Sequence, residues 1–249
     1  ARRALGFVLV IAGITAIVMV DRHRSGEREG AAAATRALSA FPQVSGSRTI
    51  SSSWFCPGAA AGDGVTAAYV NISNPGETDL VAAVSVMGAD AMEQKQVTVK
   101  PRSRAQVEFL KGRTIGVFAP QVELIGTTGT VEQQLDFPGG DVTSQCAADT
   151  ARTWWFADGF TAEGSSERVV VTNPFPDPAV VNVTYTTKDG KRTPANLQGL
   201  IIAGRTARSL SMNDLGAQDE ARLAVNVTAT TGRVVASRIQ HYIGLGRLG

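Results

Sequence analysis

The chain has 249 residues, of which 43% are hydrophobic and 18% charged, enough for one large domain or two of about 100 residues each. The net charge of +2 equals the contribution of Arg2 and Arg3, and the rest of the chain carries 22 basic and 22 acidic residues. A balanced surface argues against nucleic-acid binding, because neutralising phosphates requires a basic face.

The first feature along the chain is an uncharged apolar segment, ALGFVLVIAGITAIVMV, at residues 4–20. As a helix it would rise about 26 Å, close to the thickness of a bilayer's hydrocarbon core. Either a cleaved signal peptide or a retained anchor fits this length. Cleavage needs small residues soon after the apolar run, whereas the charged DRHRSGEREG follows here. We therefore predict an N-terminal signal anchor at 1–24, a single pass through the cell membrane, and an extracytoplasmic C-terminal bulk.

Small residues within the anchor suggest a membrane partner. Ala12, Gly13 and Ala16 lie about one helical turn apart, a spacing that allows close packing against another membrane helix, such as one of a polytopic protein. Residues 25–51 then read as an extracytoplasmic linker, because Ser, Gly and charged residues flank a short Ala run and leave too little apolar content for a core.

An internal repeat organises the rest of the chain. The matching landmarks are Trp54-Phe55 with Trp155-Phe156, Asn74-Pro75 with Asn173-Pro174, and the Thr-Thr-Gly triplets at 127–129 and 230–232. Their offsets of 101, 99 and 103 residues indicate two copies of a unit of about 90 residues. We place the copies at 52–140 and 153–249, with a connector at 141–152.

Both copies have the pattern of β-strands. Apolar and polar residues alternate in segments such as AAYVNIS (67–73) and AVVNVTYTT (179–187), which are rich in β-branched residues. Turn sequences such as NPGETD and KDGK separate these segments. Strands at intervals of 8–12 residues without helical periodicity predict an all-β fold. The expected architecture is two tandem antiparallel β-sandwich repeats, immunoglobulin-like in the broad sense, behind one N-terminal transmembrane helix.

The two cysteines fit this arrangement. Cys56 opens the first copy and Cys146 lies in the connector, whereas Ala157 takes the place of Cys56 in our alignment of the second copy. In an exported chain two cysteines most simply form a disulfide, the alternative being two free thiols. The predicted bridge would tie the start of the first copy to its exit.

Catalytic chemistry finds little support. The two histidines, His23 beside the anchor and His241 in the last predicted strand, lack the acid and nucleophile that a catalytic triad requires. Zinc binding needs three or four ligands, which two paired cysteines do not supply. The C-terminal GLGRLG matches a dinucleotide motif in letters only, because no helix follows it. We expect no catalytic residue, no metal and no cofactor.

Four acidic residues near the connector are the other candidates for chemistry: Asp136, Asp141, Asp158 and Glu163. Such acids can serve as a glycosidase pair or as weak calcium ligands, but their spacing does not match a 12-residue calcium loop. We interpret them as solvated loop acids.

The aromatic residues at the start of each copy are the candidate interaction residues: Trp54, Trp154, Trp155 and Phe160. One interpretation is that one tryptophan per copy fills the sandwich core. The other is that an exposed tryptophan stacks on a sugar or anchors a protein partner. As the extra tryptophan, Trp154 is the one we expect to face outward.

The segments WFCPG (54–58), YVNISNPGETDLVAAVSVMG (69–88) and QVTVKPRSRAQVEFL (96–110) resemble a family of uncharacterised, membrane-anchored, β-rich envelope proteins of high-GC Gram-positive (actinobacterial) bacteria. The resemblance extends over nearly the whole chain and implies no known catalytic residues. The family's genes often neighbour large membrane glycosyltransferases, which implies an accessory role in envelope polysaccharide assembly.

Two functions follow as hypotheses. The first is a non-catalytic accessory or scaffold subunit, anchored beside a polytopic membrane protein such as a glycosyltransferase. The alternative is a free-standing module that binds cell-wall glycan without an obligate partner. Neither involves enzymatic activity or nucleic acid.

Overall fold

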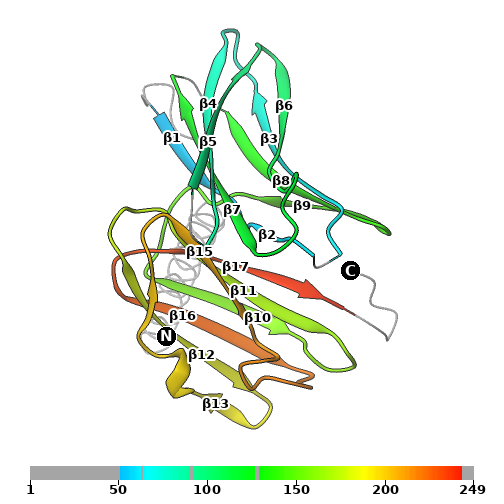
Figure 1. Ribbon diagram of the computed structural model, residues 1–249, viewed down its shortest axis with the longest axis vertical. Helices are drawn as coiled ribbons and strands as arrows, with labels where there is room; N and C mark the ends of the chain where they lie inside the picture. The colour runs from blue at the N-terminus through cyan, green and yellow to red at the C-terminus, as the bar shows by residue number, and fades with distance from the viewer. Residues whose placement is uncertain (1–50, 63, 90–91, 127–128, 243–249) are drawn as a thin grey trace, which may run out of the picture. The chain divides into compact units, whose positions relative to one another are not determined.

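The computed structural model describes residues 51–62, 64–89, 92–126 and 129–242 (Figure 1). All of them fall within one compact unit. This part of the chain is built from antiparallel strands, with one 3₁₀ turn, η1 (Ala195–Leu197), and no α-helix. It therefore contains no helix able to cross a bilayer. The predicted anchor at 4–20 and almost all of the predicted linker lie outside the described residues.

Two sheets form the first half of the described chain. One has the order β1-β7-β4-β5, with β2 also paired to β7, and the other has the order β6-β3-β8-β9. The strands are β1 (Ser51–Phe55), β2 (Ala59–Ala60), β3 (Ala67–Asn74), β4 (Leu80–Met87), β5 (Met92–Val99), β6 (Ser103–Glu108), β7 (Val117–Ile125), β8 (Thr130–Phe137) and β9 (Gly140–Gln145). The sequence pattern placed residues 141–145 in the connector, whereas here they form most of β9.

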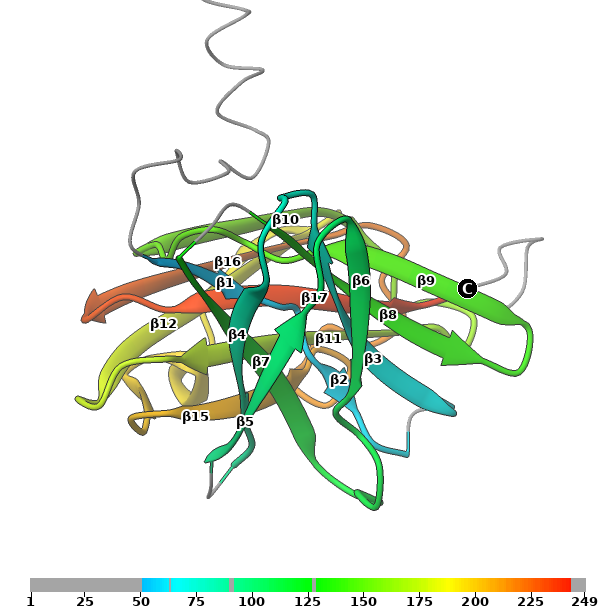
Figure 2. The same ribbon diagram turned by 90° about the horizontal axis from the view of Figure 1, so that it is seen from above.

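Two further sheets form the second half, with the orders β10-β16-β12-β13 and β15-β11-β17 (Figure 2). A short strand, β14, pairs with β12. The strands are β10 (Thr153–Gly159), β11 (Ser166–Asn173), β12 (Ala179–Thr187), β13 (Gly190–Arg192), β14 (Leu200–Ile202), β15 (Thr206–Ser211), β16 (Leu223–Thr231) and β17 (Val235–His241). The turn η1 precedes β14 along the chain.

Alternation along the strands builds a core in each half. In β12, Val181, Val183 and Tyr185 are buried while the residues between them are only half-buried. The larger buried side chains of the first core are Trp54, Ile72, Leu80, Phe109 and Leu124. Those of the second core are Tyr185, Leu197, Ile202, Met212 and Leu223. Each half thus buries an apolar cluster of its own, as a β-sandwich requires.

The strand order of the first half recurs in the second. The pairing of β1 with β7 and of β7 with β4 is repeated by β10, β16 and β12, and β6-β3-β8 is repeated by β15-β11-β17. In an immunoglobulin domain the last strand joins the sixth. Here β8, the strand that follows β7, pairs with β3 instead, while β1 pairs with β7. The immunoglobulin likeness therefore extends to two packed antiparallel sheets and not to their strand order.

A small apolar cluster joins the two halves. It contains Ala60, Val117 and Ala119 from the first half and Val170 and Ala207 from the second, with Ile239 packed against it. The backbone N–H of Ala207 also donates to the carbonyl of Gly88 at 2.9 Å. Because alanine and valine dominate this contact, the backbones of the two halves approach closely.

Candidate functional site

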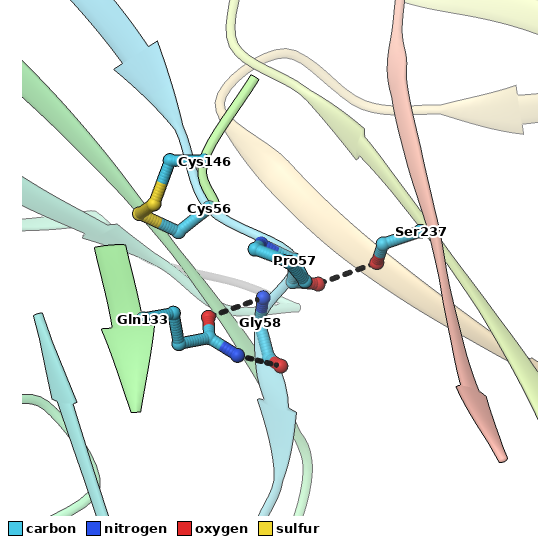
Figure 3. The surroundings of a disulfide bond; sticks show 6 residues. All are labelled: Cys56, Pro57, Gly58, Gln133, Cys146 and Ser237. Atoms are coloured by element: carbon cyan, nitrogen blue, oxygen red, sulfur yellow. Dashed lines mark hydrogen bonds between the residues drawn. A yellow bond between two sulfur atoms is a disulfide. The ribbon is translucent and has the colours of Figure 1, made fainter. Parts of the chain in front are cut away.

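The predicted disulfide between Cys56 and Cys146 is confirmed (Figure 3). Both sulfurs belong to buried residues in the core of the first half, and the bridge closes a sequence separation of 90 residues. It ties the end of β1 to the segment that follows β9. The described part of the chain has no free cysteine, so thiol chemistry has no residue to act through there.

The segment next to Cys56 is held from two sides. The buried amide of Gln133 accepts from the Gly58 N–H at 2.7 Å and donates to the Gly58 carbonyl at 2.8 Å (Figure 3). Gly58 has a φ of 86°, and a Cβ there would lie 2.8 Å from the carbonyl oxygen of Phe118, so only glycine fits. Across the junction, the Ser237 hydroxyl donates to the Pro57 carbonyl at 2.5 Å. Cys-Pro-Gly is therefore a structural joint.

The three tryptophans occupy different environments. Trp54 is only 2% exposed and belongs to the first core. Trp154 packs against the second core, and its indole N–H donates to the Val234 carbonyl at 3.0 Å. Trp155 is 75% exposed. One tryptophan per half thus packs inward, and the outward-facing one is Trp155, not Trp154 as expected from the sequence.

Strand register explains this difference. Trp54 lies opposite Val122, which pairs with Val84 on the next strand. In the second half the residue in the corresponding place is Trp154, opposite Val227, which pairs with Val183. The sequence alignment had matched Trp54 with Trp155, one residue too far. Because side chains alternate between the faces of a strand, that slip exchanges inside for outside.

Trp155 projects from the outer face of its sheet, in a row that crosses three strands. It lies opposite Asn226 on β16, which in turn lies opposite Thr184 on β12. A second row runs beside it. The outer residues of the two rows are Thr153, Trp155, Asn182, Thr184, Asn226 and Thr228, and we call this surface the Trp155 face.

The Trp155 face is polar but uncharged. The amide of Asn226 is fixed by two hydrogen bonds at 3.0 Å, donating to the Trp154 carbonyl and accepting from the Thr228 hydroxyl. The amide oxygen of Asn182 accepts from the Gly199 N–H at 2.8 Å, which leaves its NH₂ group to donate. Each row therefore combines a fixed amide with hydroxyls that retain hydrogen-bonding capacity.

Strand β10, which carries Trp155, has a bulge just beyond it. The register shifts between Phe156 and Gly159, and Asp158 has a φ of 58°. A guanidinium N–H of Arg238, on β17, donates to the Ala157 carbonyl within this bulge. A Cβ at Gly159 would overlap the carboxylate of Glu167 on β11, so a larger residue there would have to displace the Glu167 side chain.

Glu167 is the buried acid that sequence analysis overlooked. It is 1% exposed, and neither carboxylate oxygen has a hydrogen-bond partner. Burial raises the pKa of this carboxyl group to about 7, against the smaller opposing effect of Arg238. A signal was present in the sequence, because Glu167 shares strand parity with the buried Val169 and Val171.

Phe160, another candidate interaction residue, is not part of the Trp155 face. Phe160 is buried, with its backbone N–H donating to Gln240 at 3.1 Å and its ring 6.1 Å from that of Tyr242. The small residues proposed for helix packing, Ala12, Gly13 and Ala16, lie outside the described residues.

The candidate acids do not converge on one place. Asp136 and Asp141 lie opposite each other in the β8–β9 hairpin, whereas Asp158 and Glu163 belong to the second half. His241 packs edge-on against Phe137 at 5.8 Å between ring centres. Across the described ranges no group of three or more His, Cys, Asp or Glu residues is arranged to hold a metal ion.

A polar cavity of about 620 Å³ lies at one end of the second half. Its walls include Thr161, Ser166, Ser211, Asn213, Asp214 and Asp219. Asn213 is already engaged at both ends of its amide, accepting from the Glu167 N–H at 3.2 Å and donating to the Ser165 carbonyl at 3.0 Å. We assign this amide a structural role in joining the loop to β11.

Comparison with known proteins yields one family. Residues 127–243 match a family of unknown function, DUF5719. The matched region spans β8, β9 and all strands of the second half, and so includes the Trp155 face and Glu167. No curated protein matches the chain.

Proposed function

We propose that this protein is a non-catalytic accessory subunit of a cell-envelope polysaccharide assembly complex. In this proposal residues 4–20 form a single-pass anchor that packs beside a polytopic membrane protein, for which a glycosyltransferase is the leading candidate. The β-sandwiches lie outside the cytoplasm and present a binding surface. The chain would belong to the actinobacterial family of membrane-anchored envelope proteins that its sequence resembles.

The observation that carries this proposal is the Trp155 face. A tryptophan that is 75% exposed gains little from burial in the folded chain and leaves most of its ring free for a ligand. Tryptophan is also the residue most enriched among binding hot spots. The exposed ring therefore supports a binding role for the second half.

The overall architecture supports the same role. We infer that the two halves are tandem copies of one sandwich unit, because the strand order of the first recurs in the second. The disulfide, which forms readily in an oxidising compartment, supports an extracytoplasmic location. A rigid pair of modules suits a scaffold that holds a partner at a fixed distance from a membrane.

The test is a pull-down of the tagged full-length protein from native membranes in mild detergent, with every co-purifying protein identified. We expect one polytopic membrane protein in stoichiometric amount, lost when residues 4–20 are replaced by an unrelated anchor. The matched control is Trp155→Ala, which leaves the anchor unchanged and should retain the partner. Recovery of the protein alone would contradict the accessory role.

The second candidate, a free-standing module for cell-wall glycan, is favoured by one specific observation. The Trp155 face offers hydroxyls and amides but no charge, the composition of a surface for neutral polar ligands. This candidate requires no partner protein, so a protein that is recovered alone yet retains glycan binding would establish it.

A further inference from the structure

We infer that the Trp155 face is a binding site for a neutral polysaccharide chain, with one sugar ring stacked on the indole of Trp155. This inference names the ligand of the surface on which the proposed function rests. It follows from three properties of the face: its exposed ring, its lack of charge and its spacing.

The exposed ring supplies the apolar part of the contact. A pyranose has a face of C–H groups that packs on the electron-rich face of an indole, while its hydroxyls point outward at the rim. Trp154 and Phe156, the neighbours of Trp155 on β10, pack toward the core. Trp155 is therefore the one aromatic residue of β10 on its outer face.

The rest of the face supplies hydrogen bonds to hydroxyl groups. Asn226 lies next to Trp155 in the row, and its amide is fixed by bonds to the Trp154 carbonyl and the Thr228 hydroxyl. Beyond it lies Thr184, whose hydroxyl both donates and accepts. A protein hot spot is typically a tryptophan within a water-excluding ring of other contacts. Here the adjoining side chains are polar, which favours a ligand that is itself covered with hydroxyls.

The absence of charge selects against acidic and basic ligands. None of the six residues of the Trp155 face is ionisable. The charged groups at β10 lie beyond the face, in the bulge, where Asp158 follows Ala157 and Arg238 donates to the Ala157 carbonyl. An anionic polymer would lose hydration at this surface without gaining an opposite charge. Charge complementarity thus points to a neutral chain.

The spacing of the strands suits a chain of linked sugars. Neighbouring strands lie about 4.8 Å apart, so the row from Trp155 through Asn226 to Thr184 covers about 10 Å. One strand separation is similar to the length of one sugar unit. A polysaccharide that crosses the strands would therefore set its first ring on Trp155, with the next units over Asn226 and Thr184.

Titration calorimetry on the full chain tests this inference, in a detergent whose head group is not a sugar. The probes are neutral oligosaccharides of glucose, galactose and mannose, with oligogalacturonate and chitosan oligomers as anionic and cationic counterparts. We expect at least one neutral oligosaccharide to bind, and both charged series to bind more weakly. No binding by any neutral oligosaccharide, or tighter binding of a charged one, would overturn the inference.

Variants then locate the site. Trp155→Ala should weaken binding about tenfold or more, and Thr184→Val, which keeps the shape but removes the hydroxyl, should weaken it less. The control is Phe175→Ala, since Phe175 is an aromatic side chain 40% exposed in a turn away from the face. Unchanged affinity in Trp155→Ala would refute the assignment of the site. A wild-type chain that retains its membrane partner but binds no glycan would contradict this inference alone, whereas one that binds glycan but recovers no partner would contradict the accessory-subunit proposal alone.

Discussion

The two halves of the molecule share a strand order but differ at the edge formed by their first strand. In the first half, Phe55 on β1 forms an isolated bridge to Ala147, and the disulfide fixes the same segment. In the second half no described strand pairs with the outer edge of β10, which carries Trp155. Both first strands lie at the edge of their sheet, but the end of β1 is bridged and cross-linked, whereas β10 is not.

The interiors differ at equivalent positions as well. The carbonyl of Ala68 accepts from Phe109 in the first half, and that of Glu167 accepts from Met212 in the second. A buried alanine therefore corresponds to a buried acid. The second half thus buries a carboxyl group without a hydrogen-bond partner, whereas the first half, which the disulfide cross-links, buries the hydrogen-bonded amide of Gln133.

The last strands make the same contrast. Gln133, opposite Val70 on β3, donates to the Gly58 carbonyl, and Arg238, opposite Val169 on β11, donates to the Ala157 carbonyl. In both halves the side chain at this position donates a hydrogen bond to the backbone at or just beyond the end of the first strand. The donor is the neutral amide of Gln133 in the first half and the cationic guanidinium of Arg238, beside Glu167, in the second.

Loss of the disulfide should strongly destabilise the first half. Replacing Cys56 and Cys146 by serine should cost the first half about 2–5 kcal/mol, because the unfolded chain regains the freedom of a loop of about 90 residues. Urea unfolding followed by hydrogen exchange resolves the two halves. We expect reduced protection in the first core and little change in the second. Equal losses in both would show that the halves do not differ in the way proposed.

The tryptophans offer a matched pair of substitutions. Trp54→Ala should destabilise the first half by about 3–5 kcal/mol, since it empties a buried site. Trp155→Ala should change stability by less than about 0.5 kcal/mol, because the ring is exposed. Chemical denaturation of both variants measures the difference. A large loss on replacing Trp155 would mean that the ring is structural and that its face is not free to bind.

These positions show what sequence can predict here. Strand alternation and turn residues were sufficient to predict an all-β antiparallel fold. The presence of two cysteines in a chain expected to be exported was sufficient to predict the Cys56–Cys146 bridge. The register of β10 was not accessible, because Trp155-Phe156 matches Trp54-Phe55 in letters although Trp154 is the residue that corresponds to Trp54 in register. Which tryptophan faces the core is decided by strand pairing, which places Trp154 opposite Val227 and Trp155 opposite Asn226.

Glu167 was overlooked for a related reason. Its strand parity marked it as inward-facing, but a charged residue at the start of a strand usually lies at the solvated end. The structure buries it because β10 bulges over it at Gly159, a contact between residues of different strands that no local pattern encodes.

The third prediction concerns the pH dependence that Glu167 imposes on the second half. Its pKa is about 7 in the folded protein, against an ordinary value of 4.5. The folded state therefore holds this proton more tightly, and stability falls as the pH rises from about 4.5 to above 7, by about 3 kcal/mol in total. Thermal unfolding at pH 4.5 and pH 8 measures the loss.

Glu167→Gln isolates that effect from the rest of the molecule. The amide cannot ionise, so the variant should match the wild type near pH 4.5 and exceed its stability at pH 8. Glu163→Gln serves as the control, because Glu163 is an exposed acid close in sequence. Parallel pH profiles for wild type and Glu167→Gln would show that the buried carboxyl is not the source.

A smaller loss of stability than for the disulfide or Trp54 is expected at the contact between Ser237 and Pro57, which links the two halves. The Ser237 hydroxyl reaches the Pro57 carbonyl beside the disulfide, so Ser237→Ala should cost about 1 kcal/mol. The more informative measurement combines Ser237→Ala with the cysteine replacements. The loss in free energy of unfolding should then differ from the sum of the separate losses, because the disulfide positions the carbonyl that Ser237 contacts. Ser103→Ala removes a local bond to Lys100 in a turn and should remain additive with the same cysteine replacements. If the losses from Ser237→Ala and from the cysteine replacements simply add, the contact between Ser237 and Pro57 does not depend on the disulfide. The cross-link in the first half would then have no influence on the second half, which carries Trp155.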